Sequence, residues 1–244
     1  MSTRLCLHGF TGSPGSWAFL REQGVHALTP ALVGHAEPGD FPGVTRFEDE
    51  VERLAALAPP GEALHLVGYS LGARLALGLA LRDPGRVQSL TLISGHPGLH
   101  DDAERSARRA SDAEWIELLR GEGLPAFVDA WERLPLWSTQ ARLPEAVRSR
   151  KRAERLAHHG GELARSLVLT GLAEMPNYRE RLARLDLPVR LLAGERDPKF
   201  SALAKQMAAR LPRASLEIVP DAGHDLLLES PEFVTEVIRR GNQT

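Results

Sequence analysis

The fold is decided by the stretch ALHLVGYSLGARLALGLA, residues 63–80. Residues 63–67 are apolar enough for a buried strand, and the Ala/Leu-rich residues 73–80 are typical of a buried helix. Between them lies Gly68-Tyr69-Ser70-Leu71-Gly72, the G-x-S-x-G pattern of a sharp strand-to-helix turn. The flanking glycines allow the turn without clashes. The pattern predicts Ser70 as a nucleophile at a helix N-terminus, and an incidental serine in a Gly-rich turn is the alternative.

The composition suits one large α/β domain. The chain has 244 residues, 43% of them hydrophobic, and its single cysteine, Cys6, has no partner for an internal disulfide. The net charge of -2 gives no electrostatic argument for nucleic acid or an anionic membrane as a partner. No signal-peptide pattern and no apolar run of about 18 residues is present. We therefore expect a soluble, cytoplasmic protein that acts on a small molecule, with its oligomeric state left open.

Strand-like runs alternate with helix-like runs at both ends of the chain. Alternation of this kind predicts a mostly parallel sheet of about six strands with helices on both faces. The expected strands are 3–7, 25–30, 63–67, 87–94, 188–194 and 214–219, and the expected helices are 17–21, 47–57, 73–82, 201–211 and 231–239.

The segment 99–184 differs from the rest because charged residues are dense in it and β-branched residues are scarce. We expect a helical cap here, inserted into a core made of residues 1–98 and 185–244. The pattern Ser111-Asp112-Ala113-Glu114 predicts the start of a cap helix. Caps of this kind usually line the substrate pocket, although its aromatic residues could equally pack inside the cap.

A serine nucleophile needs a general base, and the base needs a group that fixes its tautomer. In this architecture the chain order is serine, acid, histidine. His224 follows the last expected strand, whereas His8, His35 and His96 come too early in that order. Asp197 follows the strand at 188–194 and is the preferred acid. The alternatives are Glu195 as the acid and a purely helix-capping role for Asp197.

The first strand ends at His8-Gly9-Phe10-Thr11-Gly12, where an oxyanion loop is usual. The backbone amides of Phe10 and Leu71 are the expected oxyanion donors. A simple turn is the alternative.

These features resemble the α/β-hydrolase superfamily and, within it, the 2-succinyl-6-hydroxy-2,4-cyclohexadiene-1-carboxylate synthase family of menaquinone biosynthesis. The elbow and the Ala222-Gly223-His224 stretch are common to the superfamily. More particular are Arg74 after the elbow, the stretch 95–99 (GHPGL) and the stretch 107–112 (ARRASD). The further matches are residues 7–13, Trp131, and residues 194–200 without Pro198.

The resemblance implies a lyase that eliminates pyruvate from a cyclohexene dicarboxylate. The Ser-His pair there abstracts a proton, and the oxyanion donors stabilise the resulting enolate-like charge. The resemblance also implies that Arg74, Arg108, Tyr69 and Trp131 bind substrate, since arginine pairs well with carboxylates. In an arginine-rich chain, solvated surface positions are the alternative for both arginines.

The chain departs from the family pattern in three places. It begins almost at the His-Gly strand, without the usual preceding hairpin, and Asp225 follows the catalytic histidine. Glu174 stands late in the cap, where a pocket for carboxylates would not favour an acid. A carboxylic ester or thioester hydrolase with the same triad is therefore the alternative function, and a non-catalytic binding protein is a third. We expect no metal and no organic cofactor, because no ligand-spaced cluster and no phosphate loop is present.

Overall fold

The computed structural model describes residues 2–240, and its centre is a sheet of five parallel strands. The strands follow one another across the sheet in chain order, and their carboxyl ends open on the same edge. Loops that follow the strands therefore meet along that edge, which is where open parallel sheets bind ligands. The strands are β1 (Ser2–Leu7), β2 (Ala63–Tyr69), β3 (Val87–Ile93), β4 (Val189–Gly194) and β5 (Ala214–Val219).

The strand expected at 25–30 does not form, so that prediction was wrong and the sheet has five strands where about six were expected. The segment joins the sheet only at an isolated bridge between Leu5 and Leu28. Two backbone hydrogen bonds flank the bridge, from Cys6 N to Leu28 O and from Leu28 N to Arg4 O. Pro30 has no amide to donate, and this limits how far the pairing can extend.

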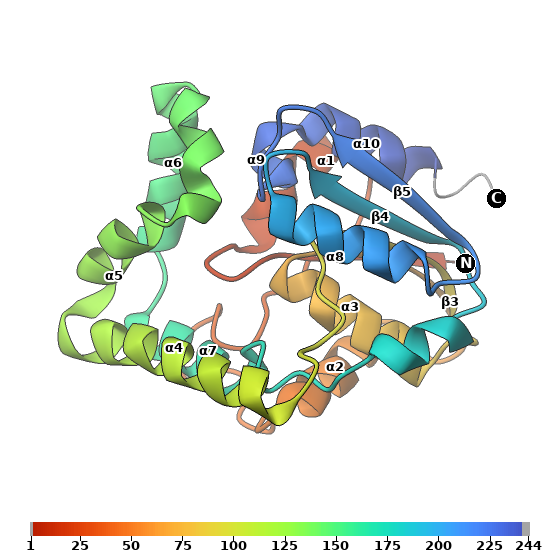
Figure 1. Cartoon of the computed structure of the whole chain (residues 1–244), viewed down its shortest axis with the longest axis horizontal. Coiled ribbons are helices and arrows are strands. Elements are labelled where there is room, and N and C mark those ends of the chain that lie inside the picture. The colour runs from red at the N-terminus through yellow and green to blue at the C-terminus, as the bar shows by residue number, and fades with distance from the viewer. Residues whose placement is uncertain (1, 241–244) are drawn as a thin grey trace.

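Helices cover both faces of the sheet (Figure 1). Two separate hydrophobic clusters, one on each face, pack these helices against the strands. One cluster includes residues of α2 (Phe47–Ala55), α3 (Leu71–Arg82) and α8 (Pro198–Ala208), and the other includes residues of η1 (Pro14–Trp17), α1 (Ala18–Glu22), α9 (Leu226–Glu229) and α10 (Pro231–Arg240).

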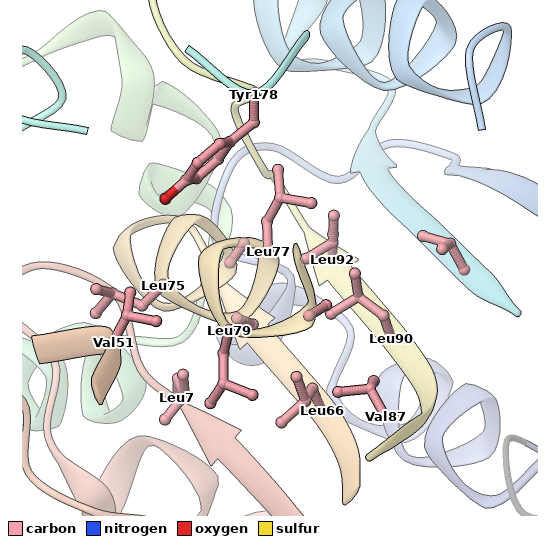
Figure 2. Close-up of a cluster of buried hydrophobic side chains, with 14 of the residues drawn as sticks. Leu7, Val51, Leu66, Leu75, Leu77, Leu79, Val87, Leu90, Leu92 and Tyr178 are labelled. Atoms are coloured by element: carbon pink, nitrogen blue, oxygen red, sulfur yellow. The ribbon is translucent and has the colours of Figure 1, made fainter. Parts of the chain in front are cut away.

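Helix α3 is the most deeply buried helix of the core. Figure 2 shows Leu77 and Leu79 of α3 among strand side chains such as Leu90. Tyr178 packs over the same helix, and the fit is close, since a Cβ at Gly78 would lie 3.1 Å from the Tyr178 hydroxyl. A helix that is apolar on nearly all sides is buried, and this explains the Ala/Leu-rich run after Ser70.

The segment between β3 and β4 is helical, as expected. Its longest helix, α4, begins at Asp102 and not near Ser111, so that prediction was wrong. Asp101 caps α4 by accepting a hydrogen bond from the amide of Glu104. Residues 102–110 are mostly Ala, Arg and Glu, which are strong helix formers, so the helix runs through Ser111 without a break. The other helices are α5 (Gly123–Glu132), η2 (Pro135–Arg142), α6 (Glu145–Leu156), α7 (Gly160–Thr170) and η3 (Arg179–Arg184).

In Figure 1, helices α4 to α7 lie beside the sheet and its own helices. The last part of the inserted segment packs with the core, since Met175, Tyr178 and Leu182 belong to the same hydrophobic cluster as α3. The division into a core of 1–98 and 185–244 and a cap of 99–184 stays a prediction. Within the described residues, no helix combines the length and the apolarity needed to cross a membrane.

Candidate active site

Ser70 lies at the junction of β2 and α3 in a backbone conformation that residues other than glycine rarely adopt. Its φ and ψ are 51° and -105°. Strain of this kind costs on the order of 1–3 kcal/mol and persists only where the surroundings enforce it. A Cβ at Gly68 would lie 2.3 Å from the carbonyl oxygen of Gly72, and a Cβ at Gly72 would lie 2.1 Å from that of Leu7. Both glycines are therefore required for the tight turn that presents the Ser70 hydroxyl.

Three polar side chains from three separate loops form a hydrogen-bonded chain at this edge of the sheet. Ser70 Oγ lies 3.1 Å from His224 Nε2, and His224 Nδ1 lies 2.7 Å from Asp197 Oδ2. His224 and Asp197 are buried. With the Nδ1 proton donated to Asp197, Nε2 is free to accept the proton of Ser70, which is the tautomer that a general base requires.

The geometry favours Asp197 over Glu195 as the partner of the histidine. Glu195 is exposed, and its carboxylate accepts a hydrogen bond from the amide of Asp221. Asp197 also caps α8, because its Oδ1 accepts a hydrogen bond from the amide of Phe200. The capping role and the histidine contact, which the sequence posed as alternatives, thus coexist on the two oxygens of one carboxylate. Helix α8 accordingly begins at Pro198 and not at residue 201 as expected.

The two amides expected to stabilise an oxyanion flank Ser70. Leu71 is the first residue of α3, where an amide has no acceptor within its own helix. Phe10 lies in a tight turn after β1, closed by a hydrogen bond from Gly12 N to Gly9 O. A Cβ at Gly9 would lie 2.7 Å from the Tyr69 ring, so the turn packs closely on the elbow. Within residues 2–240, neither the Phe10 nor the Leu71 amide has a hydrogen-bond partner.

A cavity of about 430 Å³ opens over Ser70, between the sheet edge and the helices of the inserted segment. Its core side includes Phe10, Tyr69 and His224, and its other side includes Trp115 and Trp131. Phe127 and Trp131 stack with ring centroids 5.5 Å apart, and Phe10 meets Trp131 edge to face at 5.4 Å. The cavity therefore combines a nucleophile with an aromatic wall, as small-molecule sites commonly do.

Arg74 and Arg108, both expected to bind substrate, line this cavity. Arg74 Nη1 donates to the carbonyl oxygen of Thr170, so the side chain reaches from α3 to α7. Burial and the neighbouring Arg108 lower the pKa of the Arg74 guanidinium. No carboxylate forms an ion pair with Arg74 within the described part of the chain. A partly buried cation that has no ion-pair partner favours the binding of an anion, although Asp112 lies near enough to raise the pKa of Arg74.

Arg108 is partly neutralised by Asp112, one turn further along α4. Its Nε lies 2.8 Å from Asp112 Oδ1, and the side chain of Asp112 is nearly buried. Burial raises the pKa of Asp112, although Arg108 opposes the shift. Of the two arginines, Arg74 is therefore the stronger anion-binding candidate.

The other two expected binding residues, Tyr69 and Trp131, also line the cavity. Burial raises the pKa of the Tyr69 phenol well above its usual value, so it stays protonated and can donate a hydrogen bond. The buried Nε1 of Trp131 has no partner within the described residues. The Tyr69 side chain thus offers a donor to a ligand, and Trp131 contributes its ring to the cavity wall.

Glu174, which the sequence placed in the binding region, does not line the cavity. Its carboxylate pairs with Arg109, with a separation of 2.8 Å from Arg109 Nε. Asp225 is also directed elsewhere, because it caps α9 and lies 3.7 Å from Lys151. The acids that do line the cavity are Asp112 and Glu114. Because Glu174 lies outside the cavity, it does not argue against carboxylate binding there.

Sequence reasoning missed two residues near the site. Arg155 is 2% exposed, pairs with Glu132 through Nη1 and stacks on Trp137, which in turn contacts the ring of His224. Its Nε and Nη2 have no partners within residues 2–240. Nothing in the local sequence distinguishes Arg155 from the many other arginines.

The second is His96, which the sequence considered only as a base. It lines the cavity, and its Nδ1 accepts a hydrogen bond from Gly98 N. Burial and nearby Arg74 lower its pKa to about 3. His96 is thus neutral, with its proton on Nε2.

Within residues 2–240, no group of three or more His, Cys, Asp or Glu side chains is placed to hold a metal ion. The expectation that no organic cofactor takes part stays a prediction.

Comparison with known proteins adds to this geometry. A Bacillus subtilis (strain 168) protein that bears the name 2-succinyl-6-hydroxy-2,4-cyclohexadiene-1-carboxylate synthase in provisional form is 37% identical over 96% of this chain and 88% of its own length. The Enterobacter sp. (strain 638) protein with that name is 35% identical over 93% of this chain and 86% of its own.

Solved structures agree. The structure of MenH from S. aureus is 28% identical, with a TM-score of 0.94 over 99% of this chain and 93% of that one. A thermophilic esterase from Thermogutta terrifontis, solved with malate bound, is 26% identical, with a TM-score of 0.84 over 100% of this chain and 90% of that one. A model of the alpha/beta hydrolase family matches residues 5–237. The chain belongs to the alpha/beta hydrolase family.

Proposed function

We propose that this chain is a lyase that eliminates pyruvate from a cyclohexene dicarboxylate, the reaction of the menaquinone-pathway synthases to which it is similar. The observation that carries the proposal is the position of Arg74. It is a partly buried cation that forms no ion pair with a carboxylate of the described residues, and it lines the cavity that contains Ser70. The names of the relatives, at 35–37% identity over nearly the whole chain, support the same reaction.

Ser70, His224 and Asp197 would carry the chemistry. His224 accepts the Ser70 proton at Nε2, and the serine oxygen removes a proton from the bound ring. The amides of Phe10 and Leu71 donate to the oxygen on which negative charge develops. The bond between the ring and the leaving pyruvyl group then breaks, and the leaving group takes the proton held by His224. Ser70 ends protonated and His224 neutral, so the elimination needs no acyl-enzyme intermediate. Arg74 and Arg108, with a donor from Tyr69, would hold the carboxylates beside the ring of Trp131.

A carboxylic ester or thioester hydrolase is the second candidate. The same triad and the same two amides suit attack on an acyl carbon, in which Ser70 becomes covalently acylated. The similarity to the Thermogutta terrifontis esterase favours this alternative. The two functions differ in one observable, the formation of an acyl group on Ser70.

The test is an assay of the purified protein on two substrates, the cyclohexene dicarboxylate and a short-chain nitrophenyl ester. We expect release of pyruvate with a kcat/KM at least about 100-fold above that for the ester, because binding of the carboxylates is realised only with the first substrate. Intact-protein mass spectrometry of the quenched reactions should show no acylated Ser70 with the dicarboxylate. Ester turnover with a trapped acyl-enzyme, and no release of pyruvate, would establish the hydrolase instead.

A further inference from the structure

Two histidines outside the triad hold the oxyanion loop against the loop of residues 31–36. Each ring accepts a hydrogen bond from a backbone amide of the other segment. His35 Nε2 accepts from Thr11 N at 3.1 Å, and His8 Nε2 accepts from Leu32 N at 3.3 Å. The two rings meet edge to face with centroids 5.0 Å apart. The exchange of bonds is reciprocal, so neither segment can shift without breaking both.

The tautomer of each ring is fixed by its second nitrogen. His35 Nδ1 lies 3.2 Å from the carbonyl oxygen of Val33, and His8 Nδ1 lies 2.8 Å from that of Gly9. Since Nε2 accepts in both rings, the proton is on Nδ1 and is donated to those carbonyls. Both rings are buried, at 0% exposure for His8 and 5% for His35. Neither ring has a free nitrogen left for proton transfer to a substrate, so their role differs from that of His224.

The residue that His35 holds is strained. Thr11 has a φ of 61°, in the left-handed region, and is 1% exposed. It occupies the third position of the turn from Gly9 to Gly12, where a positive φ normally calls for glycine. The Phe10 amide shares a planar peptide unit with the Gly9 carbonyl, whose oxygen accepts from His8 Nδ1 and from Gly12 N. The left-handed Thr11 closes the turn that brings Gly12 N to Gly9 O, so His8 and the conformation at Thr11 together fix the direction of the Phe10 amide.

The neighbouring loop is itself held in place by the cap. Gly34 has a φ of 76°, and a Cβ there would lie 2.4 Å from the carbonyl oxygen of Glu162 in α7. On the other side, the His35 ring meets His158, just beyond α6, edge to face at 5.4 Å. The loop that carries His35 is therefore fixed between the inserted helices and the oxyanion loop.

We propose that His35, with His8, is a positioning residue that holds Thr11 in its left-handed conformation and thereby aims the Phe10 amide at the developing oxyanion. This inference rests on the proposed use of the Phe10 amide in catalysis, but not on the identity of the substrate. It applies equally to the lyase and to the hydrolase.

The test uses a fluorophosphonate probe, which reports on the site without requiring a carboxylate substrate. The Ser70 oxygen forms a bond to phosphorus, fluoride leaves, and the serine proton passes to His224. The phosphoryl oxygen occupies the oxyanion position, so the rate of labelling depends on the Phe10 and Leu71 amides. Removal of an oxyanion donor in other enzymes costs about 10²–10³ in rate, and we expect misdirection of one donor to cost about 10- to 100-fold.

Three variants separate positioning from packing. His35→Phe keeps a ring but removes the acceptor, so the maximal labelling rate should fall while the probe concentration for half-maximal rate stays unchanged. His35→Gln places an amide oxygen near the position of Nε2 and should retain labelling within about threefold of the parent. In the double variant Thr11→Gly, His35→Phe, glycine adopts the positive φ without the histidine and should recover most of the lost rate.

His65→Phe is the matched control, because His65 is half-buried on β2 and bonds to Ser89, away from the cavity. It should label at the parental rate. Parental labelling by a folded His35→Phe variant would overturn the proposal, and so would a double variant no faster than His35→Phe. If the lyase assignment alone is wrong, pyruvate release is absent in every variant while the order of labelling rates persists.

Discussion

The sheet edge and the inserted helices contribute to one cavity in opposite ways. The sheet edge supplies fixed geometry: a strained serine between two glycines and a histidine packed among the rings of Tyr69, Trp137 and Phe200. The inserted helices supply charge and aromatic surface, including Arg108, Asp112 and Trp131. The Ser70–His224–Asp197 geometry thus comes from segments held by close backbone packing, and much of the charged and aromatic lining comes from side chains of the inserted helices. Arg74 belongs to both regions, since it starts on α3 and ends at α7.

The largest effects should come from the sheet edge, whatever the substrate. We expect Ser70→Ala, His224→Ala and Asp197→Asn each to reduce kcat by about 10⁴-fold, because triad members act as one unit. The double variant Ser70→Ala, His224→Ala should lose little more than Ser70→Ala alone. The measurement is kcat/KM on both substrates, with circular dichroism to verify folding. Full activity in Asp197→Asn, together with an inactive Glu195→Gln, would assign the acid to Glu195 and contradict the geometry.

Arg74 should show a smaller effect that depends on the substrate. Arg74→Ala should lose about 2–4 kcal/mol of transition-state stabilisation on the dicarboxylate, because charge-assisted bonds in a dry site are strong. Arg74→Lys should recover only part of this, since an ammonium cannot replace the planar fork. A neutral nitrophenyl ester should be little affected.

The pattern across the two substrates decides the role of Arg74. An equal loss on both substrates would indicate that Arg74 supports the elbow and does not bind the ligand. No loss on either would remove the argument for carboxylate binding and favour the hydrolase.

Acid should weaken the sheet edge, because burial lowers the pKa of His8 and of His35 and both are neutral when folded. Burial lowers the pKa of His8 to about 4, although its hydrogen bond to the Gly9 carbonyl opposes the shift. The unfolded chain, with a histidine pKa of about 6.5, then binds more protons between pH 6.5 and 4. Stability is therefore fully present above pH 6.5 and is lost as the pH falls toward 4, by on the order of 3 kcal/mol from His8.

Urea unfolding at pH 7 and at pH 4.5 measures this loss. His8→Gln should flatten the pH dependence relative to the parent, whereas His26→Gln, at an exposed position, should leave it unchanged. Identical pH dependence in His8→Gln and the parent would contradict the assignment.

The smallest effect should come from the exposed side of the cap. Glu174→Gln breaks an exposed pair with Arg109, and such pairs contribute roughly 0–1 kcal/mol. Activity on the dicarboxylate should stay within about twofold of the parent, since Glu174 does not line the cavity. A large gain in affinity for the dicarboxylate would show that Glu174 acts on the site after all.

The same contrast explains what the sequence could predict. The elbow and the order of serine, acid and histidine are readable because chemistry and strand geometry restrict which residues can stand there, and the structure brings Ser70, Asp197 and His224 together as expected. The start of α4 was misplaced because Ser111 offers a capping pattern inside a run of strong helix formers. The strand at 25–30 was wrongly predicted because an apolar run does not show whether its backbone pairs with a neighbouring strand over its whole length.

Contacts between distant segments left no local signal. The ion pair between Glu174 and Arg109 depends on how segments far apart in sequence meet. The same holds for Arg155, whose Nε and Nη2 have no hydrogen-bond partner within residues 2–240. The bonds between His8, His35 and the two loops join residues that are 24 positions apart. No pattern in a single sequence reports such distances, so these residues emerge only from the fold.

The two oxygens of Asp197 have a consequence for how this protein could lose its activity. One oxygen caps α8 and the other orients His224. An asparagine would still cap the helix, since Asn and Asp are comparable at that position. A cell recognises damaged proteins by the fraction that is unfolded, and that fraction would hardly change. A lineage could therefore silence the enzyme with one substitution and go on accumulating an intact, inert protein that no chaperone or protease would distinguish from the active one.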